Sequence, residues 1–214
     1  MKKNLGTLIP LQDYLRVHRV VRSALDMAGA ETAHACWFFS VAGAAILRKY
    51  YKKDAHAVAG AMCLMVDEKN ANVLCFATLE GETISSSNNA FHALVVCGDY
   101  VVDFMSPIFP ETCKSSGHSF MAPSKSFQRK IETMASSYTD LSRDGDFFFS
   151  PNDMLTDHLK NRFVQGHLQS DVLNACLEWF TKPPKPIRPT LTVADEKGQV
   201  INVKLKDGLV VGSW

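Results

Sequence analysis

The sequence has no segment that fits a membrane span or a secretion signal. No apolar run reaches the roughly 18 residues that a helix needs to cross a bilayer. The N-terminal apolar stretch from Gly6 to Leu11 follows Met1-Lys2-Lys3, is short and contains Pro10, which does not suit a secretory signal. We therefore expect a cytoplasmic protein with no membrane partner. In that reducing compartment its six cysteines are expected to be free thiols.

Motifs for metal and nucleic-acid binding are also missing. The sequence has no CxxC, HxxxH or HExxH spacing, and His34 with Cys36 supplies only an isolated pair of ligands. We expect neither a metal nor another cofactor. The formal net charge is only +1, from 23 basic and 22 acidic residues, so electrostatics give no reason to expect a nucleic-acid partner.

What is present is an ordinary globular composition, with 46% hydrophobic and 21% charged residues in 214. That length suits one domain with a substantial core, or a domain with a small appendage. The only low-complexity segment is proline-rich and favours an extended spacer. We expect an α+β domain over residues 1–181, this spacer over 182–189 and a C-terminal β-hairpin appendage over 190–214.

Apolar periodicity predicts the elements of the main domain. The apolar and polar patterns indicate helices, a first antiparallel hairpin and a sheet of about four strands. The expected helices cover Gln12 to Ala28, a segment starting near Cys36, Asp153 to Phe163 and Gln169 to Phe180, with another around Phe127 to Tyr138; the expected first hairpin pairs Ala57 to Val66 with Val73 to Leu79.

The C-terminal segment alternates apolar and polar residues. Thr190 to Ala194 and Val200 to Leu205 are expected to pair around a turn at Glu196-Lys197-Gly198, and Leu209 to Trp214 is a candidate third strand. Two interpretations stay open for this segment. It either docks on the main domain or acts as an arm that mediates dimerisation.

Cys36 occupies a position suited to a reactive thiol. It opens a nearly continuous apolar stretch, Cys36 to Leu47, whose length and alanine content predict a buried helix. A helix N-terminus favours negative charge, so a cysteine in the first turn becomes a better nucleophile. The alternative is a cysteine that only fills space in an apolar helix.

A histidine and an aspartate flank a predicted hairpin downstream. The turn Gly98-Asp99 separates two strands rich in β-branched residues, one beginning with His92 and the other containing Asp103. If Cys97 pairs with Tyr100, His92 and Asp103 share one face as diagonal neighbours, about 7–8 Å apart at Cα. Asp103 would then orient His92, which would accept the proton of Cys36.

Two other outcomes are possible for this pair. A register slip of one residue would place His92 and Asp103 on opposite faces. Alternatively, the two side chains form a buried pair that only satisfies its own polar groups. The polar loop from Glu80 to Asn89 leads directly into His92, and it either borders the site or serves as a plain connector.

The remaining cysteines are weaker candidates. Cys63, Cys75 and Cys176 fall within apolar segments and are expected in the core, while Cys97 should face away from His92. Cys113 is a real competitor, because it follows Pro110 in an apparent loop where Lys114 would lower its pKa and His118 would reach it. A flexible exposed loop nevertheless holds catalytic geometry poorly.

The segments His34-Ala35-Cys36-Trp37-Phe38-Phe39-Ser40, His92 to Val96 and Val102-Asp103-Phe104-Met105-Ser106-Pro107 resemble the papain-like and transglutaminase-like cysteine superfamily. More narrowly, the chain resembles a little-characterised bacterial family called domain of unknown function 2026. The resemblance covers residues 30–110. It implies a papain-like α+β fold with a nucleophile-bearing central helix on an antiparallel sheet, and a Cys36, His92, Asp103 triad.

Two features depart from that superfamily. Papain-like peptidases carry a glutamine before the cysteine as an oxyanion donor, but the stretch Gly29 to Ala35 has neither Gln nor Asn. The backbone N–H of Cys36 is one replacement, and Gln12, Asn88 and Asn89 are weaker side-chain candidates. The glycine-rich approach to the cysteine in arylamine acetyltransferases is absent as well, which argues against acetyl transfer.

The resemblance and the residues together predict a cysteine hydrolase that cleaves an amide or related acyl bond through a thioester. Its partner would be a peptide, a protein or a small amide or acyl substrate. Two alternatives remain open. One is a catalytically inactive binding module on the same scaffold, and the other is a transamidase or acyltransferase, in which an acceptor amine replaces water.

Overall fold

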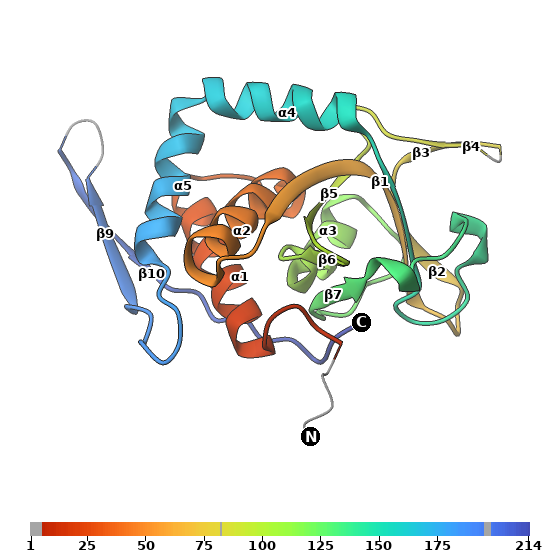
Figure 1. The fold of residues 1–214 in the computed structure, drawn as a ribbon, viewed down its shortest axis with the longest axis horizontal. Helices are drawn as coiled ribbons and strands as arrows, with labels where there is room; N and C mark the ends of the chain where they lie inside the picture. Colours follow the sequence, from red (N-terminus) through yellow and green to blue (C-terminus); the bar gives the residue numbers. More distant parts are fainter. Residues whose placement is uncertain (1–5, 82, 195–197) are drawn as a thin grey trace.

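The computed structural model describes residues 6–81, 83–194 and 198–214 and has an α+β architecture. A curled antiparallel sheet lies beside a layer of helices (Figure 1). The α-helices are α1 (Leu11–Met27), α2 (Cys36–Tyr51), α3 (Phe109–Ser115), α4 (Asp153–Gln165) and α5 (His167–Trp179). Short 3-10 helices are η1 (Thr32–His34), η2 (Ser106–Ile108), η3 (Ile131–Thr133) and η4 (Tyr138–Asp140).

The main sheet has six strands in the order β2-β1-β5-β6-β7, with β8 paired to β1. Two small hairpins, β3–β4 and β9–β10, lie outside it. The strands are β1 (Ala55–Asp67), β2 (Asn72–Phe76), β3 (Thr78–Glu80), β4 (Thr83–Ser85), β5 (His92–Cys97), β6 (Tyr100–Asp103), β7 (Phe127–Lys130), β8 (Phe147–Pro151), β9 (Thr190–Ala194) and β10 (Val200–Lys204).

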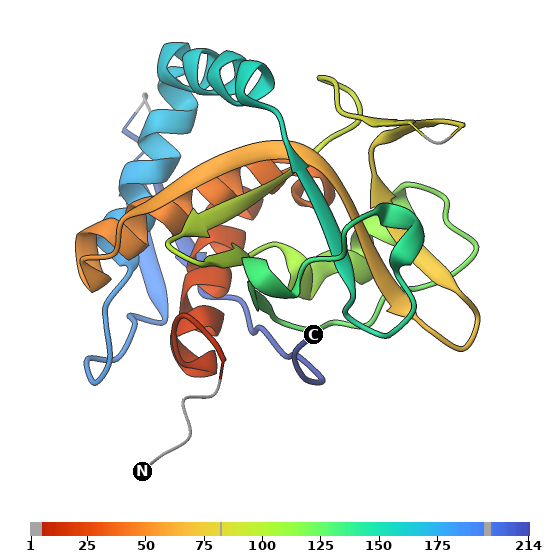
Figure 2. The same ribbon diagram turned by 45° about the vertical axis from the view of Figure 1, so that its right-hand side comes forward.

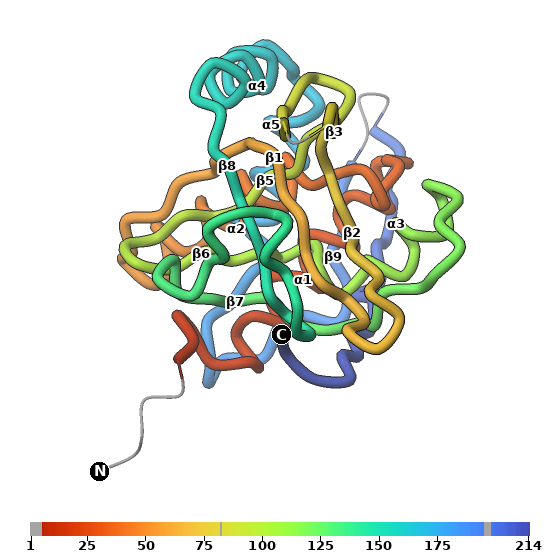
Figure 3. Tube along the Cα trace, turned by 90° about the vertical axis from the view of Figure 1, so that its right-hand side faces the viewer, coloured from red at the N-terminus to blue at the C-terminus, as the bar shows by residue number. Residues whose placement is uncertain are grey.

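Strand β1 determines the curvature of the sheet. Its first half, Ala55 to Gly60, pairs with β5, whereas its second half pairs with β2 and with β8. The strand is visibly bent where it passes from one set of partners to the other (Figure 2). Figure 3 shows the curl of the sheet from another side. The curl encloses an apolar core on its inner side, called the inner core below, which contains Leu64, Leu94 and Phe127.

The helices α1, α2 and α5 pack together, and α2 also packs on β1 and β5. A second core fills the space between them, with Phe39, Ile46 and Trp179 among its most buried members. Gly43 allows α2 to approach the ring of Phe104 closely, because a Cβ at this position would lie only 2.2 Å from that ring. No helix in the part of the chain that the structure describes is long and apolar enough to span a membrane.

Two local predictions are wrong. Residues Phe127 to Tyr138 are not a helix: Phe127 begins β7, which pairs with β6 and is followed by the 3-10 helix η3. The polar segment from Glu80 to Asn89 is not only a loop, because it contains β4, which pairs with β3 just before it. Both segments are short and polar, so their structure depends on strand pairing rather than on a local apolar pattern.

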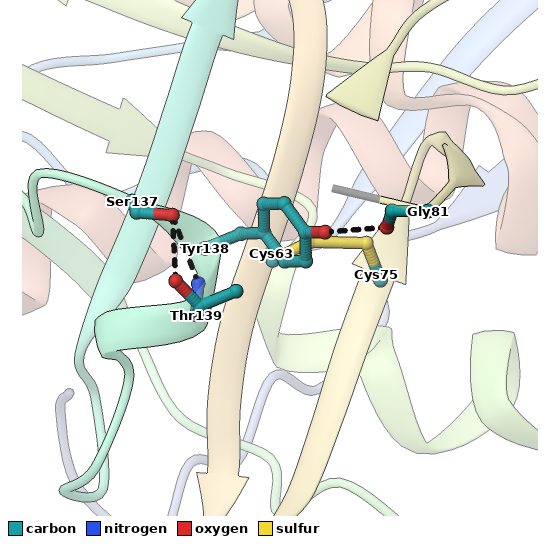
Figure 4. The surroundings of a disulfide bond; sticks show 6 residues. All are labelled: Cys63, Cys75, Gly81, Ser137, Tyr138 and Thr139. Atoms are coloured by element: carbon teal, nitrogen blue, oxygen red, sulfur yellow. Dashed lines mark hydrogen bonds between the residues drawn. A yellow bond between two sulfur atoms is a disulfide. The ribbon is translucent and has the colours of Figure 1, made fainter. Parts of the chain in front are cut away.

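The expectation of six free thiols is also wrong. Cys63 and Cys75 stand opposite each other on β1 and β2, with Cα atoms 4.2 Å apart, and form a disulfide. Tyr138 lies beside this disulfide and donates a hydrogen bond to the Gly81 carbonyl at 3.0 Å (Figure 4). Direct cross-strand neighbours are close enough for such a bond, but only the register of the two strands brings these cysteines together.

The C-terminal hairpin packs one face on the helices. Leu191 is buried in the second core, between the helices, which we call the helix-side core. The Lys206 N–H donates to the Ser23 hydroxyl of α1 at 2.8 Å. The predicted turn at Glu196-Lys197 lies outside the described residues. Leu209 to Trp214 is not a regular strand: it is held to residues 124–126 by backbone hydrogen bonds and by an isolated bridge between Ser213 and Ser126. A groove of about 700 Å³ separates the hairpin from α5.

We expect the substitution Gly60→Ala to destabilise the protein, because a Cβ at Gly60 would lie 2.1 Å from the carbonyl oxygen of Ser150. Backbone cannot move aside as a flexible side chain can, so the cost should be about 1–3 kcal/mol in the free energy of unfolding. Urea titration would measure it, with Gly6→Ala as the control, since nothing lies within 4 Å of a Cβ there. A loss no larger than in the control would contradict this packing.

Candidate active site

The three predicted site residues all stand at the ends of their elements. Cys36 is the first residue of α2, His92 is the first of β5 and Asp103 is the last of β6. All three are buried: Cys36 is 6% exposed, and His92 and Asp103 are fully covered. The fold thus brings together a thiol, an imidazole and a carboxylate that are separated by up to 67 residues in sequence.

The hairpin register is the one that the turn predicts. Cys97 pairs with Tyr100 and Val95 with Val102. Gly98 adopts a positive φ of 57°, a conformation that glycine provides at little cost in a tight turn. The register places His92 beside Asp103, and His92 Nε2 donates to Asp103 Oδ2 at 2.7 Å.

The environment of His92 favours its protonated form. Burial by itself would lower the pKa of His92, but the charge and hydrogen bond of Asp103, with a further contribution from Cys36, raise it to about 10. The imidazolium and the Asp103 carboxylate therefore form a buried ion pair at neutral pH. Such a pair is far costlier to break by removing one partner than an exposed one.

Cys36 lies in the first turn of α2, where the backbone N–H groups have no hydrogen-bond partner within the helix. The N-cap residue is Ala35, which has no side chain that can cap the helix, and the first turn contains no acidic residue. The first N–H groups of a helix have no partner within it, and the helix dipole adds partial positive charge there. An alanine N-cap costs about 1 kcal/mol compared with serine or aspartate. These donors thus remain available to an anion formed at Cys36.

The second ring nitrogen of His92, Nδ1, interacts with the Cys36 thiol without a well-formed hydrogen bond. His92 Nδ1 is buried and has no hydrogen-bond partner in the described part of the chain. The Cys36 thiol is nevertheless close enough to contribute to the raised pKa of the ring. Catalytic pairs are often this loose before a substrate binds. The arrangement leaves Nδ1 free to exchange a proton with the Cys36 sulfur while Nε2 stays bonded to Asp103.

Two phenylalanines enclose the imidazole of His92. Phe76 stacks on it with ring centroids 4.3 Å apart and planes 26° apart, and Phe109 approaches edge-on at 5.7 Å. The two phenylalanines also contact each other at 5.5 Å. Their apolar rings exclude water from the His92–Asp103 pair, which strengthens its electrostatic interaction.

Helix α1 supports the backbone around Asp103. The Tyr14 hydroxyl donates to the Asp103 carbonyl and lies 2.9 Å from the Ser106 hydroxyl oxygen. The other carboxylate oxygen of Asp103, Oδ1, accepts from the Met105 N–H at 2.8 Å. His18 donates from Nδ1 to the Phe104 carbonyl at 2.8 Å, and burial lowers its pKa to about 4. These bonds leave Asp103 little freedom to turn away from His92.

Sequence reasoning missed these supporting residues. Tyr14 is 89 residues from Asp103, and Phe76 stands at the end of an edge strand 16 residues before His92. No local pattern connects such distant positions. Only the polar character of Tyr14 on the apolar face of a predicted helix indicated that its hydroxyl needs a buried partner.

The side-chain oxyanion candidates do not join the site. Gln12, Asn88 and Asn89 are exposed, and no hydrogen bond described by the structure connects them to Cys36, His92 or Asp103. The backbone donors at the start of α2 therefore stay the best placed candidates.

The rival thiol at Cys113 is not in an exposed loop. It lies in α3, is fully buried in the inner core, and burial raises its pKa. Lys114 therefore does not activate it, contrary to the sequence prediction. Cys97 packs in the helix-side core, on the strand face opposite His92, as predicted. Cys176 is also buried in that core, and burial raises its pKa to about 12. Neither has the surroundings of a nucleophile.

Metal binding has no structural counterpart in the residues that the structure covers. No group of three His, Cys, Asp or Glu side chains in residues 6–81, 83–194 and 198–214 is arranged to hold an ion.

Comparison with known proteins identifies the family. The model of the family described as "Protein of unknown function (DUF2026)" matches residues 10–214. A solved structure, titled only as the crystal structure of a genomics target, is 32% identical, covers 98% of each chain and has a TM-score of 0.85. No curated protein matches the sequence. The family match spans nearly the whole chain and confirms the narrower of the two resemblances. The chain belongs to the DUF2026 family of proteins of unknown function.

Proposed function

We propose that this protein is a cysteine-dependent hydrolase that cleaves an amide or related acyl bond through a Cys36, His92, Asp103 triad. The observation that carries the proposal is the buried hydrogen bond between His92 Nε2 and Asp103 Oδ2, which leaves Nδ1 without a partner and close to the thiol. A pair that served only to satisfy its own polar groups would not need a free nitrogen beside a cysteine at a helix N-terminus.

The proposed reaction proceeds in two halves. In the reactive state the proton of Cys36 has already passed to His92 Nδ1, which places a thiolate beside the imidazolium, and the thiolate attacks the substrate carbonyl carbon. The tetrahedral intermediate collapses to a thioester as the carbon–nitrogen or carbon–oxygen bond breaks and the leaving group takes the proton from His92. Water then gives a proton to the neutral His92 and attacks the thioester, and the carbon–sulfur bond breaks to release the acid and restore the thiolate and the imidazolium.

The uncapped start of α2 provides the proposed oxyanion site. The N–H of Cys36 and the N–H groups that follow it point along the helix axis toward the reacting carbon. The N-cap at Ala35 offers no side chain that would compete for them. This arrangement replaces the glutamine side chain that papain-like peptidases use.

We extend the proposal to the superfamily and the fold. A nucleophile at the start of a buried helix, with the histidine and its carboxylate on adjacent antiparallel strands, is the arrangement of papain-like and transglutaminase-like proteins. The positions of Cys36, His92 and Asp103 on α2, β5 and β6 support this assignment. The substrate class that follows is a peptide, a protein or a small amide or ester.

One observation favours the rival function, a binding module without catalysis. Cys36 is only 6% exposed, so its sulfur is largely covered by neighbouring side chains. A substrate must therefore displace some of the covering side chains before the sulfur can attack. If it cannot, the scaffold binds but does not react.

Acylation of the purified protein by p-nitrophenyl acetate tests the proposal. We expect the intact mass to show one acetyl group, peptide mapping to place it on Cys36, and Cys36→Ala to abolish it. Nitrophenol release continuing after the first turnover indicates hydrolysis, whereas incorporation of a labelled amine indicates transfer. A wild-type protein that stays unmodified at Cys36 while Cys97 or a lysine reacts would contradict catalysis and favour the binding module.

Cytoplasmic residence is part of the proposal and has its own test. Cytosolic glutathione and thioredoxin keep most thiols reduced, so in the cytoplasm a Cys63–Cys75 disulfide would form transiently or as a redox response. Acid trapping of cells, followed by differential alkylation and mass spectrometry of the two cysteines, measures their state. Mostly reduced cysteines support the cytoplasm, and mostly oxidised ones argue against it.

A further inference from the structure

Phe76 makes the closer of the two aromatic ring contacts that the structure describes for His92. Its ring stacks on the imidazole at 4.3 Å, closer than the edge contact of Phe109 at 5.7 Å. A cation within about 6 Å of an aromatic ring face is attracted by the ring's quadrupole. The stack therefore favours the charged imidazolium and also resists rotation of the ring away from Asp103.

Phe76 sits where a strand would normally fray. It is the last residue of β2, and β2 is an edge strand that pairs only with β1 in the main sheet. Strand ends at a sheet edge have few partners and open easily. The preceding residue, Cys75, is bonded to Cys63 on β1, so the strand end is anchored one residue from the ring.

The disulfide and Phe76 lie on opposite faces of β2, because successive residues of a strand alternate. Cys75 faces a small apolar cluster on the outer side of the sheet that contains Tyr138 and Phe148; Tyr138 is drawn beside the disulfide in Figure 4. Phe76 faces the inner core and His92. A constraint on one face thus sets the position of a side chain on the other. The charged and titratable groups facing His92 are Asp103 from β6 and Cys36 from α2.

We propose that Phe76 is a positioning residue for His92, and that the Cys63–Cys75 disulfide fixes Phe76 against the imidazole. This inference rests on the proposed function, because it assigns the stack a part in keeping His92 aligned between Asp103 and Cys36. Phe76 contacts the reacting histidine but is not itself a reacting group. Its effect should therefore be seen in the titration of His92 as well as in the rate of the chemistry.

Nitrogen-15 NMR of histidine-labelled protein tests the proposal without any substrate. In Phe76→Leu, the midpoint of the His92 titration should fall by about 0.5–1 pH unit, because the cation–π attraction is lost. Acetylation of Cys36 by p-nitrophenyl acetate should slow by roughly 5-fold to 10-fold. The conservative variant Phe76→Tyr should restore both. Phe148→Leu is the matched control, since Phe148 is also half-buried and packs beside the disulfide without touching His92.

A double-mutant cycle tests the link to the disulfide. Replacing Cys63 and Cys75 with serine should lower the His92 midpoint in the wild-type background and leave it unchanged in Phe76→Leu. Equal shifts in both backgrounds would overturn the link through Phe76.

The role of Phe76 itself is overturned if Phe76→Leu leaves the His92 midpoint where it was, or moves it no more than Phe148→Leu does. Phe76→Met provides a second folded variant, checked by circular dichroism, if leucine is not tolerated. Failure of the proposed function would look different: Cys36 would resist acetylation in the wild type, whereas the His92 midpoint would still respond to Phe76.

Discussion

Replacing His92 with alanine should slow the acetylation of Cys36 by p-nitrophenyl acetate roughly 100-fold or more at neutral pH. A positioned general base typically contributes 100-fold to 10,000-fold to such a step. His92 Nδ1 is the basic nitrogen nearest the thiol in the described site, and without it the sulfur must lose its proton to water. Rapid-quench mass spectrometry of the intact protein gives the rate.

The sequence contains a matched control for this experiment. His56 also binds an aspartate, with Nε2 2.8 Å from Asp54, but that pair is largely exposed. His56→Ala should leave the rate of acetylation of Cys36 unchanged. Equal rates in His92→Ala and the wild type would mean that the imidazole does not act on the thiol.

Removing Asp103 should produce the largest loss of stability. Asp103→Ala leaves the buried His92 imidazolium without its partner, and breaking a buried pair in this way costs about 3–5 kcal/mol in the free energy of unfolding. Asp54→Ala removes a carboxylate from the exposed pair and should change stability by less than about 0.5 kcal/mol. Urea titration of the two variants at neutral pH makes the comparison. Similar losses for both would contradict a strong buried pair.

The same pair predicts how stability depends on pH. The pKa of His92 is about 10 in the folded protein and about 6.5 when the ring is free in solution. Because the folded state holds the proton more tightly, its stabilisation is complete below about pH 6.5 and is lost as the pH rises through about 10. The wild type should therefore lose stability over this interval.

Asp103→Asn should lose much less stability over that interval, since an amide no longer holds the proton on His92. Urea titrations at several pH values provide the measurement, with His56→Asn as the control that should keep the wild-type decline. A flat wild-type profile would contradict the raised pKa of His92.

Much of the site could be predicted because its components are locally encoded. The apolar run after Cys36 predicts a helix, and α2 begins at that residue. The turn at Gly98-Asp99 and the alternation of its flanking strands predict the register, and that register places His92 beside Asp103. Turn geometry and the two-residue period of a strand operate over a few residues, so they can be read without the rest of the fold.

Other features depend on contacts between distant segments. Phe127 belongs to a strand because β6 offers it a free edge, although its own segment is too polar and irregular to indicate one. Cys113 is buried because α3 closes against the inner core. Neither outcome follows from neighbouring residues, because strand pairing and burial are set by which surfaces meet.

The sequence by itself determined that a thiol heads a buried helix and that a histidine and an aspartate share one face of a hairpin. Only the tertiary structure decided that Cys36 meets His92, that Tyr14 holds the backbone of Asp103, and that Phe76 covers the imidazole beside a disulfide. The physical reason is the range of the interactions. Helix and turn preferences act between near neighbours, whereas these contacts join residues that approach one another only when the helix layer packs on the curled sheet.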